Sequence, residues 1–194
     1  SGGSQLFNWL NGIYGSPATW QALFDQVFDR WEELSGNTYV YEPNDDGVTH
    51  EAFPGVAGVR GDVRIGALSL DGNGGVLAYN FFPQSGDMVL DAFDSFYSNT
   101  GGQSLRLRNI LAHEHGHGKG MFHVCPANQT KLMEPFISTA YDGPQLDDTL
   151  LAQRFYGDPL EDNDNVGQAT PLSSAPIQTI PQISIDDNSD VDFF

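Results

Sequence analysis

Residues 113–123 read HEHGHGKGMFH and hold four of the five histidines in a chain of 194 residues. His113 and His117 are four residues apart, so on a helix both imidazole rings project from the same face. Gly120 allows the left-handed backbone turn that ends a helix, and the chain can then bring His123 round toward the first two rings. The stretch therefore predicts a helix, a sharp turn and a cluster of three imidazoles.

The chemistry of this cluster points to zinc. Three neutral imidazoles can hold one zinc ion and leave a fourth position for water, which is typical of a catalytic rather than a structural site. Glu114 adjoins the first ligand and is placed to accept a proton from that water and to deliver it to the leaving amine of a peptide bond. His115 falls on another face of the helix and is not expected to be a ligand. The full spacing H-E-x-x-H-x-x-G-x-x-H arises by chance roughly once in 10⁵ such chains, so a merely solvated His-rich helix is a poor alternative.

The pattern resembles the zinc-binding signature of the metzincin metallopeptidases. That family also has a Met-turn, a methionine that forms an apolar floor beneath the zinc ligands, and Met133 in KLMEP matches it. LSLDGNGGVLAYNFFPQSGDMVLDAFD, residues 68–94, further resembles the matrixin branch, the matrix metalloproteinase-like enzymes. The resemblance covers about residues 17–157. It implies an α+β fold with a twisted, mostly parallel five-stranded sheet, three helices and a Met-turn.

The matrixin resemblance also implies a structural calcium ion in the stretch 68–94. Acidic side chains and a Gly-rich loop supply the oxygen-only ligation that calcium requires. The matching carboxylates are Asp71, Asp91 and Asp94, and the matching carbonyl donors are Gly72, Gly74 and Val76. An acidic turn without an ion is the alternative.

The sequence departs from the matrixin pattern in two places. The family's second, structural zinc uses three His and one Asp, but the matching positions are Arg64, Gly66, Tyr79 and Val89, so we predict that this zinc is absent. Near the third ligand, Val124 replaces the usual Ser, the path to the Met-turn is two residues longer through CPANQT, and Glu134 replaces the usual Tyr. These changes leave the zinc chemistry intact but weaken any inference about substrate preference.

Substrate placement follows from the same resemblance. The strand Gly75–Phe81 is expected at the sheet edge above the cleft, where it can pair with an extended peptide; an edge strand with no such role is the alternative. The segment Pro135–Tyr141 is expected to form the wall of the pocket on the primed side of the scissile bond. The predicted substrate-binding residues are Gly75, Val76, Leu77, Ala78, Tyr79, Pro135, Phe136, Ile137 and Tyr141. Asp147 and Asp148 match an acid pair that caps the last helix and braces the Met-turn.

Hydrophobic spacing predicts the surrounding elements. Residues 17–35 repeat apolar side chains with helical period after Pro17, and further helices are expected over 104–118 and 146–156, the latter ended by Gly157. Short β-like runs cover 38–41, 62–65, 67–70, 76–82 and 88–90, punctuated by Gly, Asp and Asn.

Composition excludes several classes of protein. A content of 39% hydrophobic and 12% aromatic residues excludes a fully disordered chain, and no apolar run is long enough for a membrane span. A net charge of −18 argues against nucleic acid as a partner and suits either simple solubility or the binding of hard cations. The opening SGGSQLFNWL lacks the features of a signal peptide, so any secretion signal has been removed or left out. Cys125 is the single cysteine and is expected to be a free thiol.

The composition changes after Gly157. We predict residues 1–157 as the catalytic domain and 158–194 as an acidic linker and the truncated start of a second domain. The stretch EDNDNVGQATPL resembles the opening of the bacterial pre-peptidase C-terminal domain, a small β-sandwich; a solvated linker is the alternative. The sequence thus predicts a secreted, monomeric zinc endopeptidase acting on proteins or peptides. The alternatives are a catalytically silent zinc-containing attachment module, against which Glu114 argues, and an exopeptidase.

Overall fold

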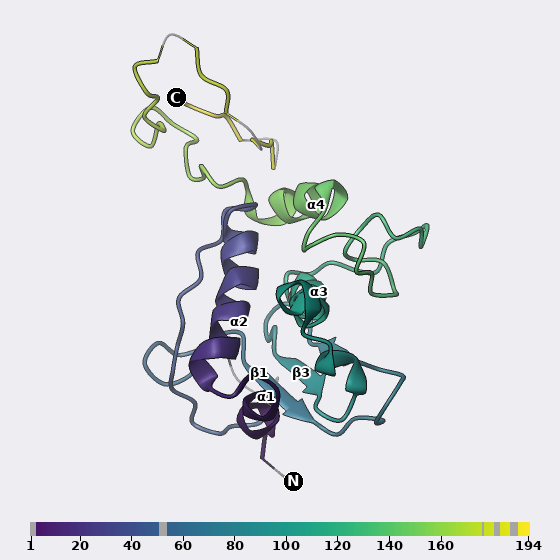
Figure 1. Ribbon diagram of the computed structural model, residues 1–194. Helices are drawn as coiled ribbons and strands as arrows, with labels where there is room; N and C mark the ends of the chain where they lie inside the picture. Colours follow the sequence, from purple (N-terminus) through teal and green to yellow (C-terminus); the bar gives the residue numbers. More distant parts are fainter. Residues whose placement is uncertain (1–2, 51–53, 176, 181–182, 187–189) are drawn as a thin grey trace.

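The computed structural model describes residues 3–50, 54–175, 177–180, 183–186 and 190–194. These residues form an α+β fold with four α-helices and a small mixed sheet (Figure 1). In chain order the elements are α1 (Leu6–Tyr14), α2 (Pro17–Glu32), β1 (Ile65–Leu68), β2 (Ala78–Asn80), β3 (Met88–Asp91), the 3-10 helix η1 (Ser95–Ser98), α3 (Gly101–Gly118) and α4 (Leu146–Tyr156).

The sheet has the order β1-β3-β2, so β3 lies in the centre and β2 at an edge. β1 runs parallel to β3 with Ile65 opposite Met88, and β2 runs antiparallel with Ala78 opposite Leu90. All four residues of β3 are buried, as expected for a strand that is covered on both faces. The outer edge of β2 has no strand partner among the described residues, and this edge faces the functional site.

The described residues form three strands where five were expected, with one parallel and one antiparallel pair rather than a mostly parallel sheet. The two expected runs at 62–65 and 67–70 are one strand, β1, and only the centre of 76–82 pairs as β2. The run 38–41 forms no ladder, because Tyr39 is used otherwise. Its backbone N–H donates to Glu32 Oε2 at 2.9 Å, and its ring packs against Phe28 and His115.

The helices follow the predicted pattern more closely. α2 begins at Pro17 and α4 spans the predicted residues, with Gly157 (φ 69°) beyond its end. α3 was expected from Ser104, and its first turn contains left-handed residues at 102–104 before the regular helix starts. α1 was not predicted, although Leu6 and Leu10 lie one turn apart and are buried in the core.

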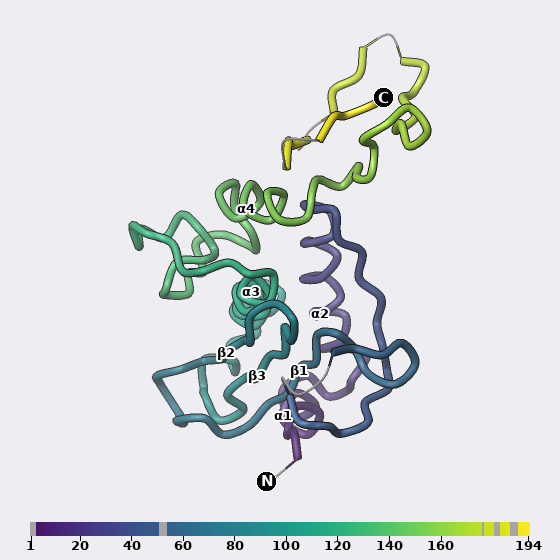
Figure 2. Tube along the Cα trace, turned by 180° about the vertical axis from the view of Figure 1, so that it is seen from behind, coloured from purple at the N-terminus to yellow at the C-terminus, as the bar shows by residue number. Residues whose placement is uncertain are grey.

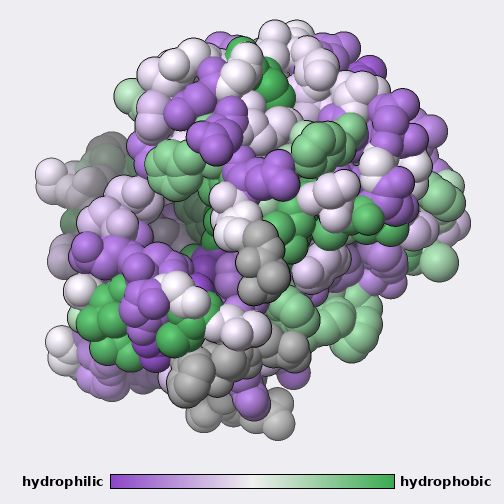
Figure 3. Space-filling model, turned by 90° about the horizontal axis from the view of Figure 1, so that it is seen from below, coloured by the Kyte–Doolittle hydropathy of each residue, from purple (hydrophilic) through white to green (hydrophobic). Residues whose placement is uncertain are grey.

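The core lies where α2 packs beside α3 and where the sheet packs against another face of α3 (Figures 1 and 2). Trp31 of α2 is fully buried, and its Nε1 donates to the carbonyl of Ala112 in α3 at 3.3 Å. Trp20, Met88, Leu90, Leu107, Leu111, Met121 and Met133 belong to the same cluster. Seen from below, from the side of α1, the surface is a mosaic of hydrophilic and hydrophobic side chains (Figure 3).

Residues beyond Gly157 extend past α4, away from the sheet, and fold back on themselves so that the two termini lie at opposite ends of the molecule (Figures 1 and 2). The start of this tail is tied to the end of α2, where Gly36 N donates to Gly157 O at 2.9 Å. A Cβ at Gly36 would lie 2.2 Å from the Tyr156 carbonyl oxygen, so this close approach of backbones requires glycine. Among the helices of the described residues, none is long and apolar enough to cross a membrane.

Candidate metal and catalytic site

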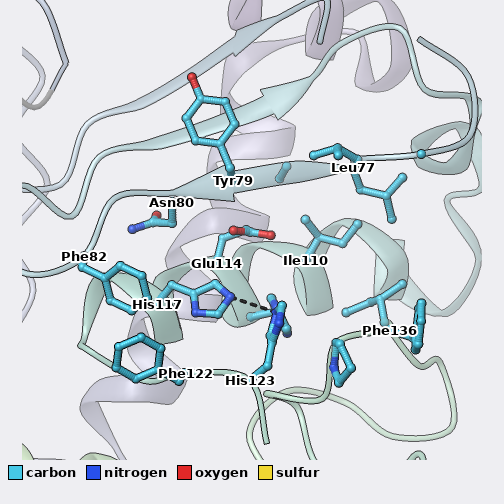
Figure 4. A pocket seen from close by; sticks show the side chains of 16 residues that line it. Leu77, Tyr79, Asn80, Phe82, Ile110, Glu114, His117, Phe122, His123 and Phe136 are labelled. Carbon is cyan, nitrogen blue, oxygen red and sulfur yellow. Dashed lines mark hydrogen bonds between the residues drawn. The ribbon is translucent and has the colours of Figure 1, made fainter. Parts of the chain in front are cut away.

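The structure brings together the three histidines that the sequence singled out. Ligand nitrogens of His113, His117 and His123 lie within 4.8 Å of one another. His123 Nε2 lies 3.2 Å from Nε2 of both other rings, and Figure 4 shows the rings of His117 and His123 converging. The turn that returns His123 is made by Gly120 (φ 96°), as expected from its place in the sequence.

Backbone carbonyls fix which nitrogen of each helical histidine faces the cluster. His113 Nδ1 lies 2.7 Å from Leu132 O and His117 Nδ1 lies 2.7 Å from Met121 O. A carbonyl oxygen only accepts, so each Nδ1 carries the proton and, in the neutral ring, each Nε2 presents a lone pair to the cluster. Burial and, to a lesser degree, the neighbouring His117 and His123 lower the pKa of His113 to about 4, against the hydrogen bond to Leu132 O that raises it, so the ring is neutral at pH 7. Converging lone pairs on neutral imidazoles fit a zinc ion.

Met133 forms the floor of this cluster. The side chain is fully buried and packs beneath α3 at Gly116, where an added Cβ would lie 2.3 Å from Met133 Sδ. Gly116 therefore gives the thioether room directly below the histidine-bearing turn of the helix. Met133 O in turn accepts from Val124 N at 2.9 Å, which links the floor to the residue after His123.

Asp148 at the start of α4 holds the Met-turn in place. Its carboxylate is buried and accepts from the backbone N–H groups of Leu132 (2.7 Å), Met133 (3.1 Å) and Gln145 (2.8 Å). It also forms a capping box with Gln145, while Asp147 is exposed. Asp148 thus both caps the helix and fixes the peptide unit whose carbonyl orients His113.

Glu134 fastens the longer path between the third histidine and the Met-turn. Its buried carboxylate accepts from the backbone N–H groups of Gln129 (2.6 Å), Thr130 (2.8 Å) and Lys131 (3.0 Å), and from Lys131 Nζ (3.2 Å). Burial alone would raise the pKa of Glu134, but these donors outweigh it and lower the pKa to about 2. The loop before Glu134 begins with the exposed thiol of Cys125. Glu134, which replaces the usual Tyr of the matrixin pattern, therefore holds this loop closed.

Glu114 lies beside the histidine cluster on the floor of a cleft. The side chain is only 7% exposed, and burial raises its pKa to about 8. A cation at the histidines would oppose this rise, because it favours the charged carboxylate. In Figure 4 the carboxylate lies between β2 and the histidine rings, toward the space that a substrate would enter.

The cleft has a volume of about 750 Å³ and runs between the edge strand β2 and the segment after the Met-turn. Phe82 and Phe122 stand side by side at one end, with ring centroids 4.8 Å apart, and Leu77 and Phe136 lie at the other (Figure 4). The lining residues are Gly75, Val76, Leu77, Ala78, Tyr79, Asn80, Phe82, Ile110, His113, Glu114, His117, Phe122, His123, Pro135, Phe136 and Ile137.

Eight of the nine predicted substrate-binding residues line this cleft. Tyr79 does so through its backbone, since its ring points away from the histidines (Figure 4). Tyr141 is the exception and lies outside the lining. Its hydroxyl donates to the Lys131 carbonyl and its own carbonyl accepts from Asn109 Nδ2 at 2.9 Å, so it holds the segment behind the cleft wall. Sequence reasoning missed Phe82, Ile110 and Phe122, which carry no spacing signal, and it placed Asn80 in the edge strand without naming it as a substrate-binding residue.

The predicted calcium residues lie in the loop before β2 and at and just after the end of β3, and their carboxylates accept from backbone donors. Asp91 accepts from Gly72 N (3.0 Å) and Phe93 N (2.9 Å), and Asp94 accepts from Gly74 N (2.7 Å). Burial raises the pKa of Asp91, but its backbone donors lower it more. Asp71 accepts from Val76 N at 3.1 Å. These three carboxylates are not one of the two groups of His, Cys, Asp and Glu side chains that converge within the described ranges, so the calcium site stays a prediction.

Two further residues lie where they serve the scaffold. Arg64, at a position of the family's second zinc, is buried and bonds through its guanidinium to Asp45 (2.8 Å) and to the carbonyl of Val48 (2.6 Å). His115 faces away from the cluster, as expected, and its Nε2 lies 2.8 Å from the Tyr39 hydroxyl. The absence of a second zinc remains a prediction.

Comparison with known proteins matches the part of the chain that contains the histidine cluster and the cleft. The sequence profile of the matrixin family matches residues 16–157. The chain belongs to the matrixin family of metallopeptidases. The match confirms the resemblance seen in the sequence, whereas the resemblance of the tail to a pre-peptidase C-terminal domain stays a prediction.

Three curated relatives resemble this matrixin. Stromelysin-3 of Mus musculus is 35% identical over 113 residues, which are 56% of this chain and 21% of that protein. The hatching enzyme of Paracentrotus lividus is 29% identical over 135 residues (66% and 20%). Stromelysin-1 of Rattus norvegicus is 32% identical over 124 residues (60% and 25%). The matched part of this matrixin thus spans only about a fifth to a quarter of each relative.

Proposed function

We propose that this matrixin is a zinc-dependent endopeptidase that cleaves extended segments of protein substrates. The observation that carries the proposal is the convergence of three histidine Nε2 atoms beside the buried Glu114, on the floor of a cleft bordered by an edge strand. His113, His117 and His123 would hold the zinc. A bound zinc supplies Lewis-acid chemistry, which acidifies water and polarises a peptide carbonyl.

Glu114 supplies the proton transfers. Its carboxylate accepts a proton from the attacking water and later donates it to the nitrogen of the departing amine. Glu114 therefore returns to its starting protonation state after each hydrolysis. The buried position excludes bulk water from the carboxyl group, and the carbonyls of Leu132 and Met121 hold two of the three rings in the orientation that leaves Glu114 open to the cleft. The groups are thus fixed before the substrate arrives.

The cleft supports binding of an extended peptide. β2 is an edge strand, and a substrate lying along its outer edge can pair with the backbone of residues 75–80 over the histidines. Phe136 and Ile137 form an apolar wall at one end and Phe82 and Phe122 another at the opposite end, so apolar side chains on both sides of the scissile bond are favoured. An elongated cleft lined along its length suits an endopeptidase.

Further features extend this proposal to the whole chain. We propose residues 1–157 as the catalytic domain and 158–194 as an acidic linker and the start of a pre-peptidase C-terminal domain. Secretion, action as a monomer, and a calcium ion at Asp71, Asp91 and Asp94 belong to the same proposal. The family match that ends at residue 157 and the strongly acidic composition support it.

Cleavage of gelatin, a denatured protein, tests the activity. The wild type is expected to release internal fragments, and a zinc chelator or Glu114→Ala should lower the rate at least about 100-fold, since a positioned acid–base group contributes 10²–10⁴-fold. Zinc content is measured on the same samples, because Glu114→Ala should keep the metal. If the zinc-loaded wild type cleaves none of a varied set of proteins, the endopeptidase assignment fails and the attachment module takes its place.

A further inference from the structure

A second group of metal-ligating side chains lies in the tail, far from the histidine cluster. Oxygen atoms of Asp158, Glu161 and Asp192 lie within 4.8 Å of one another. Asp158 and Glu161 directly follow α4, whereas Asp192 comes from the end of the chain, so the group joins two segments that are about thirty residues apart in the sequence.

Two buried oxygen atoms within or next to this group lack hydrogen-bond partners. Asn163 is fully buried, its Nδ2 lies 3.4 Å from Asp192 Oδ1, and its Oδ1 has no hydrogen-bond partner. Glu161 Oε1 is likewise buried without a partner. A buried polar atom that lacks a partner is unfavourable by roughly 1–3 kcal/mol, so two such oxygens beside converging carboxylates favour the binding of a cation here.

The charged side chains of the tail itself are all acidic. No Lys or Arg occurs in residues 158–194, and Asp158 is fully buried. Burial and, to a lesser degree, the nearby Asp190, Asp158 and Asp164 raise the pKa of Glu161 to about 7, against a hydrogen bond from Asn163 N that lowers it. Carboxylates packed this closely repel one another unless a cation lies between them.

We propose that Asp158, Glu161 and Asp192, with the amide oxygen of Asn163, bind a calcium ion that clamps the end of the chain to the end of the catalytic domain. The donors are all oxygen, which selects a hard cation. A separation within 4.8 Å accommodates calcium–oxygen distances of about 2.4 Å, and calcium, unlike magnesium, is commonly held by several protein oxygens in irregular geometry. Water and backbone carbonyls complete the coordination.

The hydrogen bonds around the group show what the ion would hold together. Asp158 Oδ2 accepts from Ser184 N at 2.7 Å, and Phe193 N donates to Asn163 O at 3.1 Å. Both Ser184 and Phe193, from the last part of the tail, are thus hydrogen-bonded to its first residues beside the carboxylate group. Asp158 itself follows Gly157, whose carbonyl accepts from Gly36 N. The clamp therefore connects the tail to the residues that follow α2, independently of the zinc site.

Calcium titration of the full chain tests the proposal. Isothermal titration should give one calcium ion fewer for E161Q/D192N than for the wild type. D162N is the matched control, since it removes one exposed charge from the same segment but is outside the group, and it should keep the wild-type stoichiometry. Equal stoichiometry for the wild type and the double variant would overturn the proposal, and so would loss of one ion in D162N.

Hydrogen exchange on the wild type alone keeps the test independent of whether the variants fold. Calcium should slow exchange at least tenfold in peptides containing Ser184 and Phe193, and an equal concentration of magnesium should have a smaller effect. Unchanged exchange in these peptides at saturating calcium would refute the site. A change confined to residues 68–94 would also refute it and assign the bound ion to that loop.

Discussion

Replacing Asp148 with asparagine tests how the floor of the zinc site is held. Oδ2 of Asp148 accepts from two backbone donors, Leu132 N and Gln145 N, and Oδ1 accepts from Met133 N. Asparagine has one acceptor oxygen, so at best it keeps the first two bonds without their charge and turns an NH₂ group toward the buried Met133 N–H. Each charge-assisted bond contributes about 1.5–3 kcal/mol and a buried donor left unpaired is unfavourable by about 1–3 kcal/mol. We therefore expect Asp148→Asn to lower the free energy of unfolding by about 2–4 kcal/mol.

Urea unfolding at fixed zinc, followed by tryptophan fluorescence, measures this loss. Asp147→Asn is the control, because Asp147 is an exposed neighbour in the same helical turn whose charge contributes no more than about 1 kcal/mol. Since Leu132 O orients His113, the variant should also bind zinc less tightly, by up to about tenfold. Equal stability of the two variants, or an Asp148→Asn protein within 0.5 kcal/mol of the wild type, would refute the bracing role of Asp148.

Three further changes probe the site and the loop beside it. Gly116→Ala places a Cβ 2.3 Å from Met133 Sδ and should lower the free energy of unfolding by about 1–3 kcal/mol in thermal melts; an unchanged melting temperature would contradict the close packing. The folded-state pKa of Glu134 is about 2, below its ordinary 4.5, so its stabilisation is present above about pH 4.5 and disappears as pH falls through 2. Glu134→Gln should therefore have a lower free energy of unfolding than the wild type at pH 7 in urea titrations, and the difference should become smaller at pH 2. A difference that does not change with pH would show that the charge of Glu134 is not its cause. Chelation of zinc should lower the melting temperature of the wild type but not of His123→Ala, and zinc at 1,000 times its Kd should restore about 4 kcal/mol to the wild type.

The histidine cluster could be predicted from the sequence because its geometry is local. His113 and His117 meet through one turn of helix, and Gly120 reverses the chain within three residues, so no distant contact has to be known. The same holds for α2 and α4, whose apolar spacing and end signals lie within each segment. Asp148 could be assigned a bracing role only through the matrixin resemblance, since nothing local links it to Leu132.

The sheet and the cleft wall depend on partners that the sequence does not reveal. The run at 38–41 has the composition of a strand, yet Tyr39 packs against His115 and Phe28 and its N–H bonds to Glu32, so this run joins no strand among the described residues. Tyr141 was assigned to the cleft wall by its place in the segment, but its hydroxyl reaches the Lys131 carbonyl instead. α1 was missed although its periodicity was present, because Gln5 at its start offers no capping signal.

The contacts of Glu134 link two departures from the matrixin pattern, the longer path through CPANQT and the glutamate at 134, so that each depends on the other. The two extra residues in the path through CPANQT create backbone N–H groups that need an acceptor, and Glu134 is that acceptor for three consecutive residues. A tyrosine at 134 would not accept these bonds, and a glutamate beside a shorter loop would be a buried charge without the donors from residues 129 and 130. Relatives should therefore carry both features or neither, and a chimera that transplants this loop into another matrixin should require Glu134 to be transferred with it.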